Sequence, residues 1–194
     1  MARRIAAVVL AVCAACGGGG SPTFATGSAS VTGTIGGRSM TPRDAISAVL
    51  QNGSNTVGGV VITNVDTTCA KINARQVPRN LQTVQLGIGT RSSSTIIVGP
   101  AGPDVFPVHA LTESFNVVGK VAIVAFTSLD ANCVQNASFD VVTGGNVTLT
   151  KVDSSGYTGT FDVTFATSPT SHVTGSFTAA NCPPLASNPS GICT

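Results

Sequence analysis

Charged and aromatic side chains are scarce in this chain of 194 residues, which has no tryptophan, one tyrosine and a single glutamate, Glu113. Only 9% of its residues are charged. Strong helix formers such as glutamate and lysine are few, whereas Val, Thr and Ile, which favour strands, are abundant. This composition predicts a β-rich domain, and low charge with many Ser, Thr, Gly and Asn residues is typical of exported β proteins.

The chain has no excess of charge of either sign once its first residues are set aside. Arg3 and Arg4 belong to the N-terminal signal described below, so 8 of the 10 basic residues remain, against 8 acidic ones. These counts provide neither a basic patch for nucleic acid nor an acidic run. Residues 99–102, Gly-Pro-Ala-Gly, are not followed by a lysine and form no phosphate-binding loop. We therefore expect no nucleic-acid partner and no cofactor.

The apolar run at residues 5–15 is too short to span a membrane. As a helix it would rise about 16 Å, roughly half of the hydrocarbon core of a bilayer. It follows Arg3 and Arg4 and ends in small residues, which is typical of a secretory signal peptide. We expect residues 1–15 to be removed on export.

Cys16 follows Ala14 and Ala15 and precedes four glycines and a serine. This stretch resembles the lipobox of bacterial lipoproteins, in which a cysteine is acylated and becomes the first residue of the mature chain. The resemblance implies lipidation of Cys16 and a stable membrane anchor, since two or more acyl chains bind a bilayer firmly. Gly17, in place of an aspartate, implies the outer membrane of a bacterium with two membranes.

The lipobox usually has leucine three residues before the modified cysteine, where this chain has Cys13. A register that ends at Cys13 has that leucine, Leu10, but it places the branched Val12 where a small residue is expected. We favour Cys16, because a flexible Gly-rich tether follows it and residues 16–28 together form the expected anchor segment. Residues 29–194 are predicted to form a single β domain.

Four further cysteines, Cys69, Cys133, Cys182 and Cys193, predict two disulfide bonds in an exported chain. Three pairings are possible, and we favour Cys133 with Cys182 and Cys69 with Cys193. None of these cysteines has the CxxC spacing of a zinc or thioredoxin-like site, so we expect no metal.

Alternating apolar and polar residues predict strands along most of the domain. The C-terminal block is the clearest, and there Tyr157, Phe161 and Val163 share the face that we expect to be buried. The continuous apolar run at residues 121–126 predicts a strand that is buried on both faces or wrapped inside a barrel. The expected strands are residues 31–35, 45–50, 57–63, 81–90, 95–98, 121–126, 146–152, 157–166 and 172–179.

Two segments carry signals for other structures. Residues 66–75 predict the one helix, with Asp66 as its N-cap and Cys69 on its buried face. Thr41 as N-cap and Pro42 at the first position would also suit a helix that runs through Leu50, so the strand over residues 45–50 is the favoured of two alternatives. Residues 99–107, with three prolines, predict a loop.

A short pattern, apolar-Thr-Gly-Thr/Ser-apolar, recurs at residues 31–35, 157–161 and 173–177. A glycine inside a strand weakens it unless it permits a bend or a close approach of another group. We expect these glycines to serve a strongly curved sheet. The predicted fold is therefore mainly β, a curved antiparallel β-sandwich or barrel with one short helix.

Residues 145–165, GNVTLTKVDSSGYTGTFDVTF, and residues 172–182, HVTGSFTAANC, form a meander that ends at a cysteine. This block resembles the C-terminal half of a group of uncharacterised β-rich bacterial lipoproteins, and residues 67–75 are a second, shorter stretch of resemblance. The resemblance implies no activity.

No arrangement of catalytic residues is evident in the sequence. His109 and Glu113 have the i, i+4 spacing of a helical metal site, but a proline-rich loop precedes them. Ser94 lacks the GxSxG pattern of a nucleophile elbow, and His172 falls on the polar face of an expected strand. A hydrolase would need His109 to meet Glu113, Asp104 or Ser94 in one cleft. We expect that the protein is not an enzyme.

The sequence predicts an envelope lipoprotein, anchored through acylated Cys16, whose β domain is non-catalytic and structural or protein-binding. Besides the membrane, envelope proteins are the partners that we expect. One alternative is a lipocalin-like carrier that holds a small apolar ligand inside a barrel, of which a large apolar cavity would be the sign. The second alternative is a hydrolase with a site assembled from distant residues.

Overall fold

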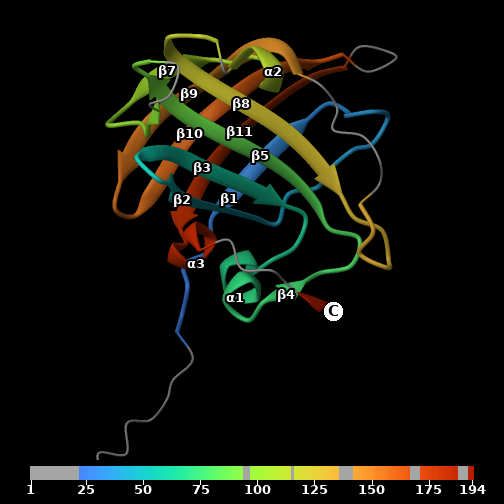
Figure 1. The fold of residues 1–194 in the computed structure, drawn as a ribbon. Helices are drawn as coiled ribbons and strands as arrows, with labels where there is room; N and C mark the ends of the chain where they lie inside the picture. Colours follow the sequence, from blue (N-terminus) through green and yellow to red (C-terminus); the bar gives the residue numbers. More distant parts are fainter. Residues whose placement is uncertain (1–21, 94–96, 115, 136–141, 167–170, 188–191) are drawn as a thin grey trace, which may run out of the picture.

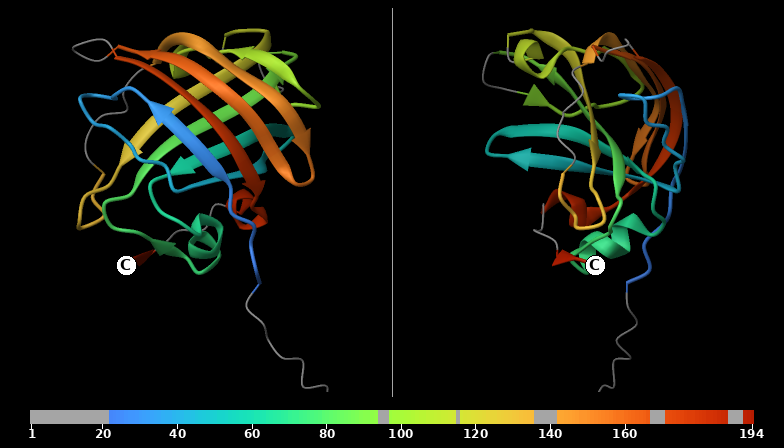
Figure 2. Two further views of the ribbon diagram at one scale, coloured as in Figure 1. Left: turned by 180° about the vertical axis from the view of Figure 1, so that it is seen from behind. Right: turned by 90° about the vertical axis from the view of Figure 1, so that its right-hand side faces the viewer.

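The structure is a computed structural model, and it describes residues 22–93, 97–114, 116–135, 142–166, 171–187 and 192–194. The described residues form a strongly curled sheet of ten strands, an open half-barrel, with a second sheet of two short strands and three short helical segments (Figure 1). The prediction of a mainly β domain built on a curved sheet is confirmed. The two views of Figure 2 show the curl of the sheet from behind and from the side.

The strands of the large sheet come from the whole length of the domain. They are β1 (Ser28–Thr32), β2 (Asp44–Asn52), β3 (Asn55–Thr63), β5 (Gln82–Arg91), β6 (Ile97–Val98), β7 (Asp104–Pro107), β8 (Gly119–Ser128), β9 (Val142–Asp153), β10 (Gly156–Phe165) and β11 (Ser171–Asn181). The remaining elements are α1 (Thr68–Asn73), β4 (Gln76–Val77), α2 (Leu111–Ser114), α3 (Pro183–Ala186) and β12 (Ile192–Cys193).

The structure decides between the two alternatives for one segment and corrects the prediction for another. Residues 45–50 lie within β2, so the strand was the correct alternative there. The prediction of a loop over residues 99–107 is wrong at its end, because β7 pairs with β9 and buries Phe106 in the core. Pro107 is the last residue of β7, and proline is tolerated there because β7 is the terminal strand in the sheet order.

The strands follow the order β6-β5-β3-β2-β11-β10-β9-β7, with β1 beside β11 and β8 beside β5. Neighbours are antiparallel except for β11 and β2, which are parallel where Ala180 lies opposite Ile46. A single bridge between Val108 and Ala122 joins the chain after β7 to β8. The curl therefore brings the two ends of the sheet toward each other.

The core lies on the concave, inner face of the sheet. Side chains alternate along each strand, so Val84, Leu86 and Ile88 of β5 all point inward, as their spacing predicted. In β10 the inward residues include Phe161 and Phe165, which are at most 2% exposed. Burial of such side chains stabilises the fold by roughly 1.5–3 kcal/mol each relative to exposure.

Two of the recurring glycines make room for aromatic rings in this core. Gly175 lies opposite Phe161 and Gly159 lies opposite Phe177 across the β10–β11 ladder. A β-carbon at Gly175 would overlap the Phe161 ring, and one at Gly159 would come within 3.0 Å of Phe177 Cζ. The close approach expected from the pattern is therefore present, and rings packed over glycines help to pin the register of a curved sheet.

A cap of small elements lies at one end of the half-barrel, where α1, α3 and β4 are found with the C-terminus (Figure 1). Disulfide bonds join Cys69 to Cys182 and Cys133 to Cys193. All four cysteines are bonded as predicted, but the favoured pairing, Cys133 with Cys182 and Cys69 with Cys193, is wrong.

The parallel contact of β11 with β2 explains the first bond. It carries Cys182 to the outer side of the sheet, into a buried cluster with Ile46 and with Cys69 of α1. The second bond follows from the small sheet, in which Cys193 lies opposite Val77. The turn that contains Cys133 lies beside β4, since Asn80 N–H donates to Asp130 O at 3.0 Å.

The first turn of α1 is capped by a side chain from another strand. Asp44, at the start of β2, is 1% exposed. Its carboxylate accepts hydrogen bonds from the N–H groups of Thr68 at 2.8 Å, Gly27 at 2.9 Å and Ala45 at 2.8 Å. One buried carboxylate thus joins the N-terminal segment, the sheet and the helix.

Asp66, the N-cap that the sequence predicts, does not cap the helix. It pairs instead with Lys71 at 3.2 Å and its side chain is 81% exposed. Thr67 occupies the N-cap position in the left-handed conformation, with φ of 51°, and makes no side-chain cap. The helix itself, within residues 66–75, is confirmed.

The first described residues, 22–27, leave the domain at the capped end (Figure 1). Phe24 packs against the cluster of Ile46, Cys69 and Cys182. The expected lipidation residue, Cys16, and the rest of the predicted signal and tether up to residue 21 lie outside the described residues. In the part of the chain that the structure describes, no helix combines the length and the apolar character needed to cross a membrane.

Candidate functional site

The outer surface of the half-barrel has two faces of opposite character. On β2, β3 and β8 the outward side chains are mainly apolar, and β5 between them presents glycines and Gln85, whereas on β1, β9, β10 and β11 they are mainly Ser and Thr. A sheet with one face in the core normally presents polar residues on the other. The apolar half therefore departs from the usual pattern and is the first candidate for a binding surface.

The apolar half contains a groove of about 600 Å³, which we call the apolar groove. Val61, Ile123 and Ala125 line it and are only half-buried, while Gln51 and Gln85 are exposed at its polar margin. A concave, mostly apolar surface of this volume with a few polar groups is typical of binding pockets. Its lining residues are Leu50, Gln51, Gly59, Val60, Val61, Gln85, Leu86, Gly87, Ile123, Ala125, Leu185 and Ala186.

The groove is lined by two glycines that face each other across neighbouring strands. Gly59 of β3 lies opposite Gly87 of β5. A β-carbon at Gly59 would come within 3.0 Å of Leu50 Cδ1, whereas one at Gly87 would meet nothing closer than Val57 Cγ1 at 3.7 Å. No side chain covers the backbone at Gly87 in the described structure, so an unbranched apolar group of a ligand has room to lie there.

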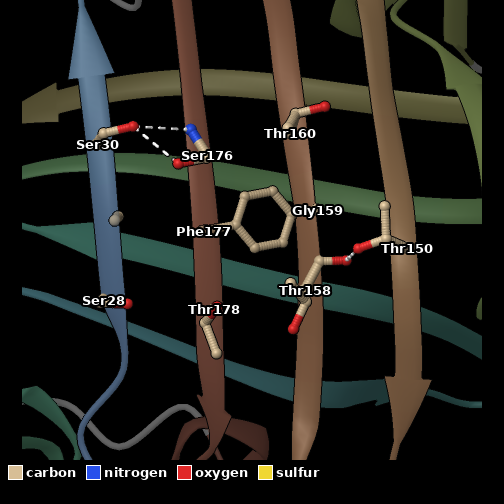
Figure 3. Close-up of a pocket in the computed structure, with 10 residues that line it drawn as sticks. Ser28, Ser30, Thr150, Thr158, Gly159, Thr160, Ser176, Phe177 and Thr178 are labelled. Atoms are coloured by element: carbon tan, nitrogen blue, oxygen red, sulfur yellow. Dashed lines mark hydrogen bonds between the residues drawn. The ribbon is translucent and has the colours of Figure 1, made fainter.

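The polar half carries a regular array of hydroxyl groups over a shallow hollow of about 440 Å³. In register across β1, β11 and β10, three side chains form one row and three form the next, about 4.8 Å apart along a row and roughly 7 Å between rows. Figure 3 shows both rows, with Thr150 of β9 beside them. We call these six residues the hydroxyl face: Ser28, Thr178 and Thr158, then Ser30, Ser176 and Thr160.

Most hydroxyls of this face have no partner among the residues that the structure describes. Ser30 Oγ and Ser176 Oγ lie 2.8 Å apart, and Ser176 N–H donates to Ser30 Oγ at 3.2 Å. Among the described residues, the side chains of Thr158, Thr160 and Thr178 make no hydrogen bond, and neither does that of Ser28. No charged side chain lines the hollow.

An exposed ion pair lies on the same side of the sheet, beyond the hydroxyl face. His172 Nε2 is 2.6 Å from Asp162 Oδ1, and the two side chains are 62% and 65% exposed. His172 is therefore on the polar face, as the sequence predicted, although its pairing with Asp162 was not. Such an exposed pair contributes little to stability.

The residues considered for catalysis do not form a catalytic arrangement in the described structure. Asp104 pairs with Lys120, whose Nζ lies 2.6 Å from Oδ1, and this bond holds the pKa of Asp104 below its ordinary value. Within the described residues the His109 side chain makes no hydrogen bond or ion pair with Asp104 or Glu113. Ser94 lies outside the described residues.

The described residues likewise contain no group of three or more His, Cys, Asp or Glu side chains placed to hold a metal ion. The four cysteines of the domain form the two disulfide bonds of the cap.

Sequence reasoning missed both surfaces, although each left a signal. The apolar run at residues 121–126 predicted a strand buried on both faces, yet β8 alternates, with Val124 buried inside and Ile123 and Ala125 half-buried on the outer side. Apolar residues at the outward positions of this strand, where polar ones are usual, are the sequence signal of the groove. The signal of the hydroxyl face is Ser/Thr at alternate positions of three strands.

Comparison with known proteins gives no match: no family model, no curated protein and no solved structure is similar to this chain at a significant level.

Proposed function

We propose that this protein is an envelope lipoprotein, anchored in the outer membrane through acylated Cys16, whose β domain is a non-catalytic module that binds an envelope protein in the apolar groove. The groove is the observation that carries the proposal. Val61, Ile123 and Ala125 remain half-exposed on the outer side of a sheet, and exposed apolar patches of this kind commonly mark protein interfaces.

The position of the N-terminal segment supports this arrangement. Residues 22–27 leave the domain at the capped end, and Phe24 packs against the same cluster as Leu185 of α3. Leu185 also lines the apolar groove. A chain tethered through Cys16 would therefore hold the α3 end of the groove toward the membrane, within reach of the periplasm-facing part of a membrane protein.

A carrier with its ligand inside the barrel fits the structure less well. The described inner side chains pack against one another as one core cluster, in which Phe126, Phe161 and Phe165 fill the concave face. An apolar group is more readily received on the outer side, where the groove is open above Gly87.

The anchor predicts a defined change in mass and location. In the native host we expect a mature chain that begins at Cys16 and carries acyl groups, found in the membrane fraction. A Cys16→Ala variant is expected to lose the acyl mass and to leave that fraction, because nothing else in the proposal holds the chain to the bilayer. Intact mass spectrometry of both fractions measures this, and an unmodified soluble wild-type chain would overturn the anchor.

Filling the groove is expected to abolish docking without unfolding the domain. A photo-reactive amino acid at Gln85, on the margin of the groove, should cross-link to one envelope protein in intact cells. A Gly87→Leu change places a side chain where the structure has space, so we expect at least a tenfold loss of that adduct with thermal stability nearly unchanged.

The matched control places the same photo-reactive residue at Thr148, on the other half of the sheet, and should give no such adduct. An adduct that persists in the Gly87→Leu variant, or that forms equally from Thr148, would show that the groove is not the docking surface.

A further inference from the structure

We propose that the hydroxyl face is a second binding site, and that its ligand is a neutral polysaccharide chain. The face lies on β1, β10 and β11 and shares no lining residue with the apolar groove on β2, β3, β5 and β8, so this site does not depend on the protein docking proposed above.

The backbone of the two inner strands of the hydroxyl face is already paired within the sheet. β11 lies between β1 and β10 over residues 174–178, and β10 lies between β11 and β9. Among the described strands β1 pairs with β11 alone, so an extended peptide could add to the sheet only at the outer edge of β1, beside the rows. A ligand that lies across the rows on β10 and β11 is therefore held by side chains.

The side chains exclude most classes of partner. Nucleic acid and other polyanions need lysine or arginine, and the hollow has no charged lining residue. Protein interfaces gain most of their affinity from aromatic, arginine and large apolar side chains at their centre, and the outward positions of this face are serine and threonine. What the face presents is hydroxyl groups, each of which can donate one hydrogen bond and accept others.

A chain of neutral sugars matches this chemistry. Thr158, Thr160 and Thr178 have hydroxyls without a hydrogen-bond partner in the described part of the chain, and they lie on adjacent strands in two rows (Figure 3). Sugar hydroxyls also donate and accept, so repeated sugars laid across the rows would satisfy these groups without a charge being buried. The hollow of about 440 Å³ is long enough across three strands to receive more than one sugar ring.

Titration with two neutral hexasaccharides, chitohexaose and cellohexaose, tests the proposal. The full chain would be purified in a zwitterionic detergent that has no sugar head group, since a maltoside would compete. We expect at least one of the two to shift the backbone amide resonances of β1, β10 and β11 in a saturable way. Replacing both Thr158 and Thr178 by valine keeps their shape and removes two hydroxyls, so binding should weaken about tenfold.

Thr90→Val, at an exposed threonine of β5, is the matched control and should leave the affinity unchanged. Circular dichroism and thermal melting of the double variant show whether the sheet is intact. The proposal is overturned if neither hexasaccharide shifts these resonances at millimolar concentration, if the shifts map to another surface, or if the folded double variant binds as tightly as the wild type.

Discussion

An Asp44→Ala variant is expected to lose about 3–5 kcal/mol of the free energy of unfolding, because three backbone N–H groups lose their buried acceptor at once. Hydrogen bonds to a charged group contribute roughly 1.5–3 kcal/mol each, and the groups left behind are only partly reached by water. The loss would appear in urea unfolding as a lower midpoint with a similar slope. It would be a large part of the 5–15 kcal/mol that is typical of a domain.

Asp66→Ala is the matched control for Asp44→Ala. Asp66 is the N-cap that the sequence predicts, but its side chain is 81% exposed and, among the described residues, pairs with Lys71. We therefore expect a change within about 0.5 kcal/mol. A larger loss for Asp66→Ala than for Asp44→Ala would show that the helix is capped locally, against the structure.

Removal of the bond between Cys69 and Cys182, by alanine at both positions, is expected to destabilise the domain by about 5 kcal/mol. The bond closes a loop with a sequence separation of 113 residues, and the chain-entropy model gives about 4.8 kcal/mol for a loop of that length. Both cysteines are also at most 1% exposed in the cluster with Ile46, so packing is lost as well. Thermal melting of the oxidised proteins measures the difference.

Alanine at both Cys133 and Cys193 is the comparison. This bond has a sequence separation of 60 residues, for which the same model gives about 4.3 kcal/mol, and Cys193 is only half-buried. The double variant at Cys69 and Cys182 should therefore be the less stable of the two. Peptide mapping without reduction provides an independent check, and a fragment that joins Cys69 to Cys193 would contradict the structure of the cap.

The two proposals assign different ligands to the two outer faces of one sheet. The apolar groove is lined by residues of β2, β3, β5, β8 and α3, while the hydroxyl face lies on the strands of the other half of the sheet. If both proposals hold, an envelope protein and a neutral polysaccharide would bind side by side without competing. Cross-linking from Gln85 in the presence of the hexasaccharide would then be unchanged.

The local alternation of apolar and polar residues by itself predicted much of the fold. The alternation in residues 81–90 identified the inward set Val84, Leu86 and Ile88, and the three C-terminal strands were placed to within a few residues. It succeeds because each inward or outward choice depends on neighbours two residues away. The same local reading singled out the glycines of the recurring pattern, of which Gly159 and Gly175 lie under aromatic rings, whereas Gly33 follows the end of β1.

Only the tertiary structure decided the cap and the two surfaces. The parallel contact of β11 with β2 joins residues more than a hundred positions apart. It brings Cys182 to Cys69, its disulfide partner. In the same cap, α1 lies where Asp44 can accept a hydrogen bond from its first turn. The hydroxyl face likewise exists only because Ser28, Thr178 and Thr158 fall in one row of the sheet. Sequence spacing carries no information about such long-range register, since the free energy that sets it comes from packing between distant strands.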